Sequence, residues 1–377
     1  MIEASSVTGV AKAVLEFARE ARNAHAGLPE VEVSILTFSR GGSRNGMADA
    51  ARDLDVPVDV VSERRRFDTE IIPQLRTLVS QRRPDVIWSN SIKSHFIVRS
   101  AGLRHSAGWI AFHHGYTATD AKMLLYNQLD RWSLPAADRV LTSSQAFSEE
   151  LRNVPAQRIQ VQRMPVRAAE AVPEERQAEL RRRLGLRPGT RVLLCVARLS
   201  REKGHAVLLP AFARMRAVAP QIPLKLVLVG TGPEQVRIEK MSRALHLHDS
   251  AVLAGHQADV APYYAIADVV LLPSLSEGCP NVLLEAMAAR VPVVASAVGG
   301  VPEIVVNEKD ALLVKANDPE ALAQATLRLL TDPALHTRLA EAGPDVLSRH
   351  SPKAYFESLV SVFSEACAQR ASSRQGS

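Results

Sequence analysis

The sequence predicts an α/β protein built from two doubly wound parallel sheets. Short apolar runs of three to six residues alternate with amphipathic segments along most of the chain, and glycine follows several of these runs. That alternation is typical of parallel strands with helices on both faces of the sheet. The length of 377 residues fits two domains of roughly 100–200 residues each. We expect an N-terminal domain over residues 1–166, a C-terminal domain over residues 167–350, and a terminal helix within residues 351–377 that can pack back on the N-terminal domain.

The C-terminal half shows the alternation clearly. Its expected strands are residues 192–197, 224–229, 252–254, 269–272 and 293–295, and its expected helices include residues 205–218, 234–245 and 281–289. Apart from Lys225, these strands are apolar, as expected for strands buried on both faces. In such sheets, ligands bind outside the carboxyl ends of the strands.

The N-terminal half repeats the pattern more faintly. Strands are expected over residues 31–36, 58–61, 86–88, 109–112 and 140–142, and helices over residues 11–24, 69–81 and 123–133. Residues 165–179 are polar and contain proline, so they are expected to link the domains. Only seven residues precede the turn at Thr8-Gly9, so the first strand is expected to be short or truncated, and the chain could start upstream of Met1.

The formal charge of +6 is spread evenly along the chain. Residues 1–165 hold 21 Lys and Arg against 18 Asp and Glu, and residues 166–377 hold 25 against 22. Nucleic-acid-binding proteins usually concentrate their basic residues in one stripe or domain, so the sequence argues against a nucleic-acid partner. Anionic small molecules, or transient contact with an anionic inner-membrane surface through residues 64–66 and 82–83, fit better; surface solubility explains those arginines equally well.

The cysteines and the apolar runs indicate an intracellular chain. Cys195, Cys279 and Cys367 are far apart and lack metal-ligand spacing, so they are expected to be reduced thiols, and no metal is expected. No apolar run approaches the roughly 18 residues that a membrane span needs. We therefore expect a cytoplasmic protein that can also work at the cytoplasmic face of the membrane.

Two glutamates bracket a loop and a helix start directly after the strand at 269–272. Glu285, one turn into the helix, could accept hydrogen bonds from a ribose diol, and Glu277, in the loop, could accept them from sugar hydroxyls. The alternative is that Glu277 is a solvated loop charge and Glu285 only complements the helix. The residues between them favour a site, because Gly278 permits close backbone approach and Pro280 suits an early helical position. The amides of Cys279, Asn281 and Val282 would then point out of the helix start, an arrangement that binds phosphate.

Two cations stand at the exit of another strand. Arg198 directly follows the run at 192–197, and Lys203 lies five residues further on. Together they could neutralise a diphosphate and stabilise it as a leaving group. A solvated basic loop is the alternative, and it is the better interpretation of Arg201.

Glycine turns and a histidine complete the candidate set. Gly230 and Gly232 begin a dinucleotide-like pattern, but Gln235 stands where the third glycine should be, so the turn either lies beside a nucleotide or is only a turn. Of the adjacent pair His113 and His114, one is expected to face the core and His114 the site, although a single histidine is more often structural.

The evidence for an acceptor site is weaker. Lys93, Lys122 and Arg131 could bind an anionic acceptor, and solvated surface charge is the plainer explanation of all three.

These residues, in this order, resemble glycosyltransferase family 4. The resemblance covers most of residues 190–306 through Arg198, Lys203, the Gly230 turn, Gly255, residues 277–285 and the Gly-Gly-Val-Pro-Glu turn at 299–303. It continues more weakly through residues 8–10, 114–115 and 137–144. The family has the GT-B fold, which implies two Rossmann-like domains facing each other across a cleft, the first binding the acceptor and the second the nucleotide-sugar donor.

The resemblance implies a metal-independent, retaining hexosyltransferase-type enzyme without a cofactor, whose donor is a UDP-, GDP- or ADP-sugar. It assigns the diphosphate to Arg198 and Lys203, the donor sugar to Glu277 and His114, and the ribose to Glu285. The remaining donor-binding residues would be Gly9, Gly230, Gly255, Gly278, Cys279, Pro280, Asn281 and Val282. The acceptor would be a sugar or a lipid-linked molecule in cell-surface polysaccharide or glycolipid synthesis.

Other functions remain open from the sequence. A sugar-nucleotide epimerase, a synthase with a soluble acceptor and an inactive nucleotide-binding scaffold would share the same fold. The sequence identifies neither the nucleotide base, the sugar, the acceptor, the linkage nor the oligomeric state.

Overall fold

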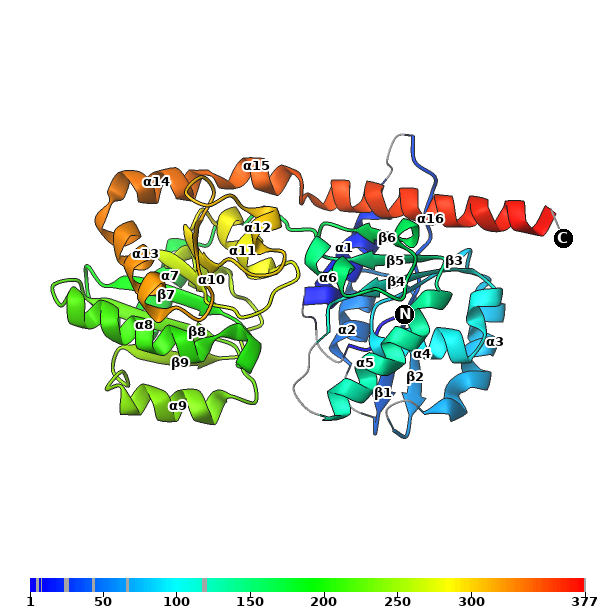
Figure 1. The fold of residues 1–377 in the computed structure, drawn as a ribbon, viewed down its shortest axis with the longest axis horizontal. Coiled ribbons are helices and arrows are strands. Elements are labelled where there is room, and N and C mark those ends of the chain that lie inside the picture. Colours follow the sequence, from blue (N-terminus) through cyan, green and yellow to red (C-terminus); the bar gives the residue numbers. More distant parts are fainter. Residues whose placement is uncertain are drawn as a thin grey trace. The chain divides into compact units, whose positions relative to one another are not determined.

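A computed structural model of the chain describes residues 1–4, 7, 9–23, 27–42, 45–65, 68–116 and 121–375, without the side chains of residues 121, 122 and 373–375. The chain forms two compact units, which we call unit 1 and unit 2. Unit 1 comprises Met1–Pro165 and Ser351–Ser377, and unit 2 comprises Val166–His350. Each unit is a parallel α/β structure (Figure 1), as the alternating sequence pattern predicts.

Unit 2 contains a six-stranded sheet in which every pairing is parallel. The strand order is β12-β11-β10-β7-β8-β9. The strands are β7 (Arg191–Val196), β8 (Leu224–Val229), β9 (Ala251–Gly255), β10 (Val269–Leu272), β11 (Val293–Ser296) and β12 (Leu312–Val314). The chain leaves β7 toward β8 on one side, whereas β10 pairs with β7 on the other side. The β7/β10 boundary is therefore the topological switch point, where ligands bind in sheets of this kind.

Helices cover both faces of this sheet. The apolar cluster on one face includes residues of α8 (His205–Val218), α9 (Gln235–Ala244), α13 (Pro319–Thr331) and α14 (Pro333–Glu341). The cluster on the other face includes residues of α10 (Ala261–Ala265), α11 (Asn281–Ala288), α12 (Val301–Ile304) and α15 (Gly343–Ser348). Successive β7 residues Leu193 and Leu194 belong to opposite clusters, as the two-residue period of a strand requires.

The predicted linker at residues 165–179 is too long. Helix α7 (Glu174–Arg183) already begins within it. Glu174 and Glu175 stand in its first turn and three arginines in its last, so its charges complement the helix dipole. This helix is difficult to recognise from composition, because Leu180 is its only buried residue.

Unit 1 contains a four-stranded sheet, β3-β4-β5-β6, and a two-stranded sheet, β1-β2, all with parallel pairings. The strands are β1 (Ile35–Arg40), β2 (Val58–Glu63), β3 (Val86–Ser89), β4 (Gly108–His113), β5 (Arg139–Thr142) and β6 (Ile159–Val161). The strand predicted at residues 31–36 is wrong by four residues at each end. The three-residue strand β6 was not predicted, nor were the helices at Gly46–Asp53, Ile92–Ser100 and Gln145–Glu149.

The first residues of the chain lie between the two sheets of unit 1. The amino group of Met1 donates to the Trp88 carbonyl at 2.7 Å, and the Asn90 amide donates to the Met1 carbonyl at 3.1 Å. On the other side, the Ile2 amide donates to the Leu36 carbonyl at 2.9 Å. Met1 and Ile2 thus connect β1 to β3 by main-chain hydrogen bonds. Burial lowers the pKa of the Met1 amino group to about 5.

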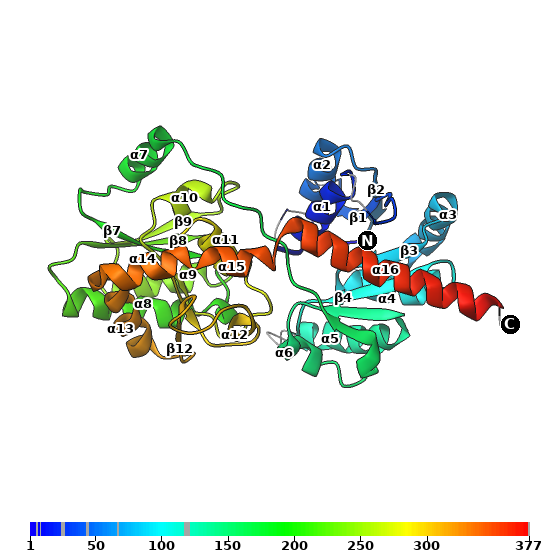
Figure 2. The ribbon, with the colours of Figure 1, turned by 90° about the horizontal axis from the view of Figure 1, so that it is seen from above.

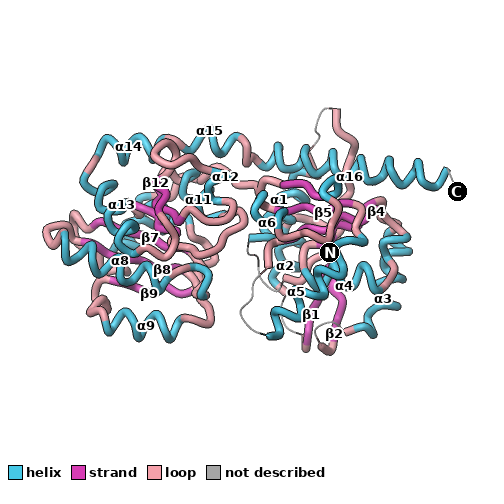
Figure 3. The backbone as a smooth tube through the Cα atoms, viewed as in Figure 1, coloured by secondary structure: helices cyan, strands magenta, loops and turns pink. Residues whose placement is uncertain are grey.

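The helices of unit 1 are α1 (Gly9–Glu20), α2 (Gly46–Asp53), α3 (Ile72–Arg82), α4 (Ile92–Ser100), α5 (Ala121–Ser133), α6 (Gln145–Glu149) and α16 (Pro352–Gln375). Helix α16 packs against α1, β3 and β4, although it is the last element of the chain (Figure 2). Figure 3 separates helices, strands and loops by colour and shows α16 as one long helix. Among the described residues, no helix is both long and apolar enough to span a membrane.

Candidate active site

Three loops of unit 2 meet at the carboxyl ends of β7, β8 and β10. The Leu275 amide, after β10, donates to the Glu202 carbonyl, after β7, at 2.7 Å. The loop after β7 is also joined to the loop after β8, because the Leu199 amide donates to the Thr231 carbonyl at 3.0 Å and the Glu234 amide donates to the Leu199 carbonyl at 2.9 Å. These main-chain bonds hold the three loops as one platform at the switch point.

Glycines permit this close packing of loops. A Cβ atom on Gly204, whose φ is +69°, would lie 1.9 Å from the Pro273 carbonyl oxygen. A Cβ atom on Gly232 would lie 2.3 Å from the Leu199 carbonyl oxygen. Because real side chains never approach a backbone so closely, the loops can interlock only with glycine at these positions.

The platform carries a buried carboxylate paired with a lysine. Lys203 Nζ donates to both oxygens of Glu277, at 2.8 and 2.9 Å, and the Ser274 hydroxyl donates to Oε1 at 2.6 Å. The Glu277 side chain is 5% exposed, whereas the Lys203 side chain is 25% exposed. The paired charges offset the desolvation of the carboxylate, and the ammonium remains accessible to a ligand. The structure thus brings together two residues that the sequence places 74 positions apart.

The Gly299-Gly300 turn supports the backbone of Glu277. The Gly300 amide donates to the Glu277 carbonyl at 3.1 Å. A Cβ atom on Gly299 would lie 1.8 Å from the same oxygen, and the φ of Gly299 is +51°. The turn therefore fixes the loop that presents the Glu277 carboxylate.

Glu285 lies on α11 and contacts a second buried side chain. The Tyr264 hydroxyl donates to Glu285 Oε2 at 2.9 Å. Burial raises the pKa of Tyr264 well above its usual value, and the nearby Glu285 raises it further, so the phenol stays protonated and donates. Glu285 is partly exposed, so its carboxylate is both oriented and reachable.

The start of α11 offers main-chain donors beside Glu277. Pro280 is the N-cap residue, and the Leu283 amide bonds to the Pro280 carbonyl at 3.0 Å. The first amides of a helix have no carbonyl partner within it, and in α11 these belong to Asn281 and Val282. Gly278, Cys279, Asn281 and Val282 are all partly exposed.

The other predicted donor-site residues of unit 2 lie at strand ends. Arg198 is exposed in the loop after β7. The Gly230 amide donates to the Gly255 carbonyl at 2.8 Å, which joins the ends of β8 and β9. A Cβ atom on Gly230 would lie 2.0 Å from the Ala197 carbonyl oxygen, whereas one on Gly255 would meet nothing within 4 Å.

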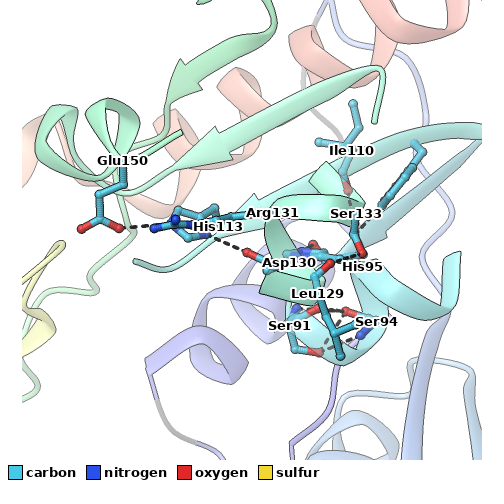
Figure 4. Close-up of polar contacts among 12 residues, drawn as sticks. Ser91, Ser94, His95, Ile110, His113, Leu129, Asp130, Arg131, Ser133 and Glu150 are labelled. Carbon is cyan, nitrogen blue, oxygen red and sulfur yellow. Dashed lines mark hydrogen bonds and ion pairs between the residues drawn. The ribbon is translucent and has the colours of Figure 1, made fainter. Parts of the chain in front are cut away.

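In unit 1, the two predicted histidines differ in burial. His113 ends β4 and is 2% exposed, and its Nδ1 lies 3.1 Å from Asp130 Oδ2 (Figure 4). His114 is half-buried, its ring packs on Phe112, and burial lowers its pKa to about 3. Gly9 is the exposed first residue of α1, and Thr8 lies outside the described residues.

The structure describes the side chains of two of the three acceptor candidates. The Lys93 side chain is fully buried and forms an ion pair with Glu63, so it presents no ammonium to the surface. The side chain of Lys122 lies outside the described residues. Arg131 is exposed, and its guanidinium lies 4.8 Å from the centre of the Tyr116 ring.

Several residues that contact the predicted set, or its neighbour His113, were missed from the sequence. Ser274 stands three positions before Glu277 in the same loop, and this spacing could have suggested it. Tyr264 and Asp130 gave no local signal, because their partners lie 21 and 17 positions away. Among the described residues, no group of three His, Cys, Asp or Glu side chains could hold a metal ion.

Comparison with known families agrees with this geometry. The sequence signature described as "Glycosyl transferases group 1" matches residues 176–346, and the one described as "Glycosyl transferase 4-like domain" matches residues 8–167. The chain belongs to the group 1 glycosyltransferases of family 4. The matched ranges include the Lys203–Glu277 pair in one case and His114 in the other.

Curated relatives in family 4 match over part of their length. The N-acetyl-alpha-D-glucosaminyl L-malate synthase of Bacillus anthracis is 32% identical over 43% of this chain and 42% of its own length. The lipopolysaccharide core biosynthesis glycosyltransferase LpsD of Rhizobium meliloti is 33% identical over 48% of this chain and 51% of its own length. The chain therefore spans about half the length of these relatives.

A solved structure shares the fold over nearly the whole chain. Anabaena Alr3699/HepE in complex with UDP-glucose aligns with a TM-score of 0.82 and 18% identity, covering 97% of this chain and 98% of that one. At this identity the match shows the fold alone, which is GT-B with two Rossmann-like domains.

Proposed function

We propose that the protein is a retaining, metal-independent glycosyltransferase that moves a sugar from a nucleoside-diphosphate sugar to an acceptor hydroxyl. The proposal depends mainly on the Lys203–Glu277 pair, which lies at the switch point beside the start of α11. An accessible ammonium and free helix-start amides suit a diphosphate, and a buried, oriented carboxylate suits sugar hydroxyls. Membership in family 4 supports the same activity.

Each donor contact has an assigned residue. Arg198 and Lys203 bind the diphosphate, and the backbone of residues 278–282 lines it. Glu277 binds the donor sugar, and Glu285, oriented by Tyr264, binds the ribose hydroxyls. Gly230 and Gly255 line the part of the site that binds the nucleotide. The family resemblance alone supports the assignment of His114 and Gly9, both in unit 1, to the donor sugar.

The reaction exchanges one bond at the anomeric carbon. The bond from that carbon to the phosphate oxygen breaks, and the leaving nucleoside diphosphate keeps the electron pair. The acceptor oxygen forms the new bond on the same face, which retains the configuration, and its proton passes to the departing phosphate oxygen. Lys203 and Arg198 stabilise the negative charge that develops on that oxygen. This route requires no nucleophile from the protein.

For the donor, we propose a hexose linked to UDP as the first compound to test, with GDP and ADP sugars as alternatives. The fold relative solved with UDP-glucose supports this order. For the acceptor, we propose a sugar or lipid-linked molecule that reaches Arg131 in unit 1. Relatives described in lipopolysaccharide core and teichuronic acid biosynthesis support a role in cell-surface polysaccharide or glycolipid synthesis. Such a role would place the protein in the cytoplasm, at the cytoplasmic membrane face.

The test combines binding with turnover. UDP-, GDP- and ADP-sugars are titrated into the protein by calorimetry, and nucleoside diphosphate release is then measured with and without lipid-linked acceptors. We expect one nucleotide class to bind and acceptor to accelerate release, with the anomeric configuration retained in the product. Absence of both binding and transfer across the panel would overturn the proposal. Release of an isomerised nucleotide sugar without acceptor would indicate an epimerase instead.

A further inference from the structure

Four side chains of unit 1 form a continuous chain of contacts that ends at the loop after β4. His95 Nδ1 lies 2.6 Å from Asp130 Oδ1, and His113 Nδ1 lies 3.1 Å from Asp130 Oδ2. His113 Nε2 then lies 3.6 Å from Glu150 Oε2. Figure 4 shows His113 between Glu150 and Asp130, with His95 on the other side of Asp130. We call these four residues the histidine–carboxylate chain.

Basic and acidic side chains alternate along this chain. Asp130 is fully buried, and a buried carboxylate persists only when it is paired. Burial alone raises the pKa of Asp130, but the two histidines outweigh it and hold that pKa well below its usual range. Burial likewise lowers the pKa of His113, yet its contacts with Asp130 and Glu150 raise the pKa overall. The two carboxylates therefore favour the protonated form of His113, although its Nε2, 3.6 Å from Glu150, has no hydrogen-bond partner among the described residues.

Glu150, at the outer end of the histidine–carboxylate chain, contacts both ends of the loop of residues 113–116. Glu150 contacts the His113 ring and also accepts a hydrogen bond from the Tyr116 amide at 3.0 Å. The Tyr116 ring packs on the His113 ring, with centroids 4.4 Å apart. Between them, Gly115 has a φ of +83°, and a Cβ atom there would lie 2.3 Å from the Phe147 ring. The loop is thus held in one conformation by contacts with α5 and α6.

His114 is the side chain that this loop presents. Its ring packs on Phe112, and its Nε2 is buried without a hydrogen-bond partner among the described residues. Burial, and to a lesser extent the neighbouring His113, lower the pKa of His114 to about 3, so His114 is uncharged at neutral pH. An uncharged imidazole with a vacant ring nitrogen can exchange one hydrogen bond with a hydroxyl group. A buried polar atom left unpaired is costly unless a ligand completes it.

We propose that Asp130 and Glu150 are positioning residues that act through His113 to fix the 113–116 loop and so aim His114 at the donor sugar. The inference rests on the proposed function, because it takes the contact between His114 and the sugar from there. It adds two residues from outside the site, on α5 and at the end of α6. A sugar contact misplaced by about 1 Å can lower turnover by about 100-fold, so such supports affect the rate.

The proposal has a pH signature. The groups that face His113 are Asp130 from α5, Glu150 from α6, His114 in the loop and, through Asp130, His95 from α4; Arg131 acts through the Tyr116 ring. Since the folded pKa of His113 is raised, its ion pairs with Asp130 and Glu150 are lost as pH rises through that pKa. Removing one carboxylate lowers the pKa, so the loss begins at lower pH.

The decisive variant is Glu150→Gln, because Glu150 is one-third exposed and its replacement by the isosteric amide should fold. We expect kcat to fall about 10-fold, with KM for the nucleotide sugar changed less than about 3-fold because the nucleotide contacts lie in unit 2. The alkaline limb of the kcat profile should move to lower pH. Glu149→Gln, a neighbouring exposed carboxylate, is the matched control and should behave as the wild type.

Asp130→Asn provides a second measurement that does not depend on turnover. NMR titration of His113 should give a lower pKa in both Asp130→Asn and Glu150→Gln than in the wild type. An active wild type whose kcat and pH profile are unchanged by Glu150→Gln overturns this inference alone. A loss of activity in Glu150→Gln that merely follows reduced stability, with the pH profile unmoved, also overturns it. A wild type with no sugar transfer overturns the proposed function and this inference with it.

Discussion

At the scale of single residues, the Lys203–Glu277 pair links two parts of the proposed donor recognition, binding of the diphosphate and binding of the sugar. An ammonium has three donors, and two of those on Lys203 face Glu277. The third remains for a phosphate oxygen, so one cation can contact the leaving group and the carboxylate beside the sugar at once. The Ser274 hydroxyl donates to one oxygen of the same carboxylate, so the Glu277 side chain is less free to move with the lysine side chain.

We expect Lys203→Ala to act mainly on turnover. Without the ammonium, charge on the departing diphosphate is less stabilised, and kcat should fall about 100- to 1,000-fold. Nucleoside diphosphate release under saturating donor measures the effect. Arg201→Ala is the matched control, because Arg201 is an exposed cation in the same loop. Unchanged turnover in Lys203→Ala would show that its assigned role is wrong.

Glu285→Ala should act on binding instead. Hydrogen bonds to a charged group contribute about 1.5–3 kcal/mol, so donor affinity should weaken roughly 10- to 100-fold. Tyr264→Phe keeps the carboxylate but removes the hydroxyl that orients it, and should weaken affinity by less than about 10-fold. Calorimetric titration with the nucleotide sugar compares the two. Equal losses in both variants would mean that Tyr264 contacts the ligand itself.

Single residues also show where prediction from sequence fails. Glu277, Glu285 and Lys203 could be selected because each follows a recognisable buried strand. Lys93 looked like a surface cation, yet it is fully buried against Glu63, which lies 30 positions away. A buried charge is recognised only when its partner is known.

At the scale of elements, the interlocked loops of unit 2 depend on glycine. Gly204→Ala should place a Cβ atom against the Pro273 carbonyl in addition to straining a positive φ, and should lower the free energy of unfolding by roughly 3 kcal/mol or more. Gly189→Ala is the control, since its φ is +79° but nothing lies within 4 Å, so only the strain of about 1–2 kcal/mol applies. Urea denaturation measures both. Equal destabilisation would mean that the loops are less tightly packed than the structure shows.

The two sheets differ in how well the sequence predicts them. Five of the six strands of unit 2 could be located almost to the residue, because they are largely apolar, and the short strand β12 (Leu312–Val314) was missed. In unit 1, strand β1 begins four residues later than expected, since the apolar alternation continues from Val31 through Phe38 and gives no boundary. Strand β6 has only three residues, one of them Gln160, so it lacks the length and the period that identify a strand.

At the scale of the whole molecule, the chain crosses between the units twice. It leaves unit 1 after Pro165 and returns at Ser351, so the last element belongs to the first fold. Aromatic contacts join the two segments, with Phe17 of α1 lying 5.1 Å from Phe356 and 5.5 Å from Phe363 of α16 between ring centroids. The apolar face of α16 is thus part of the core of unit 1, and unit 1 cannot complete that core until α16 has been synthesised.

This arrangement predicts that a change near the C-terminus destabilises the N-terminal fold. Phe356 is 2% exposed, so Phe356→Ala should lower the free energy of unfolding of unit 1 by about 3–5 kcal/mol while leaving unit 2 unchanged. Phe212→Ala, fully buried on α8, should do the reverse. Scanning calorimetry, with a saturating nucleotide sugar added to raise the unit 2 transition, assigns the two transitions. If Phe356→Ala moved the ligand-sensitive transition instead, α16 would stabilise unit 2, contrary to the packing of its aromatic face on α1.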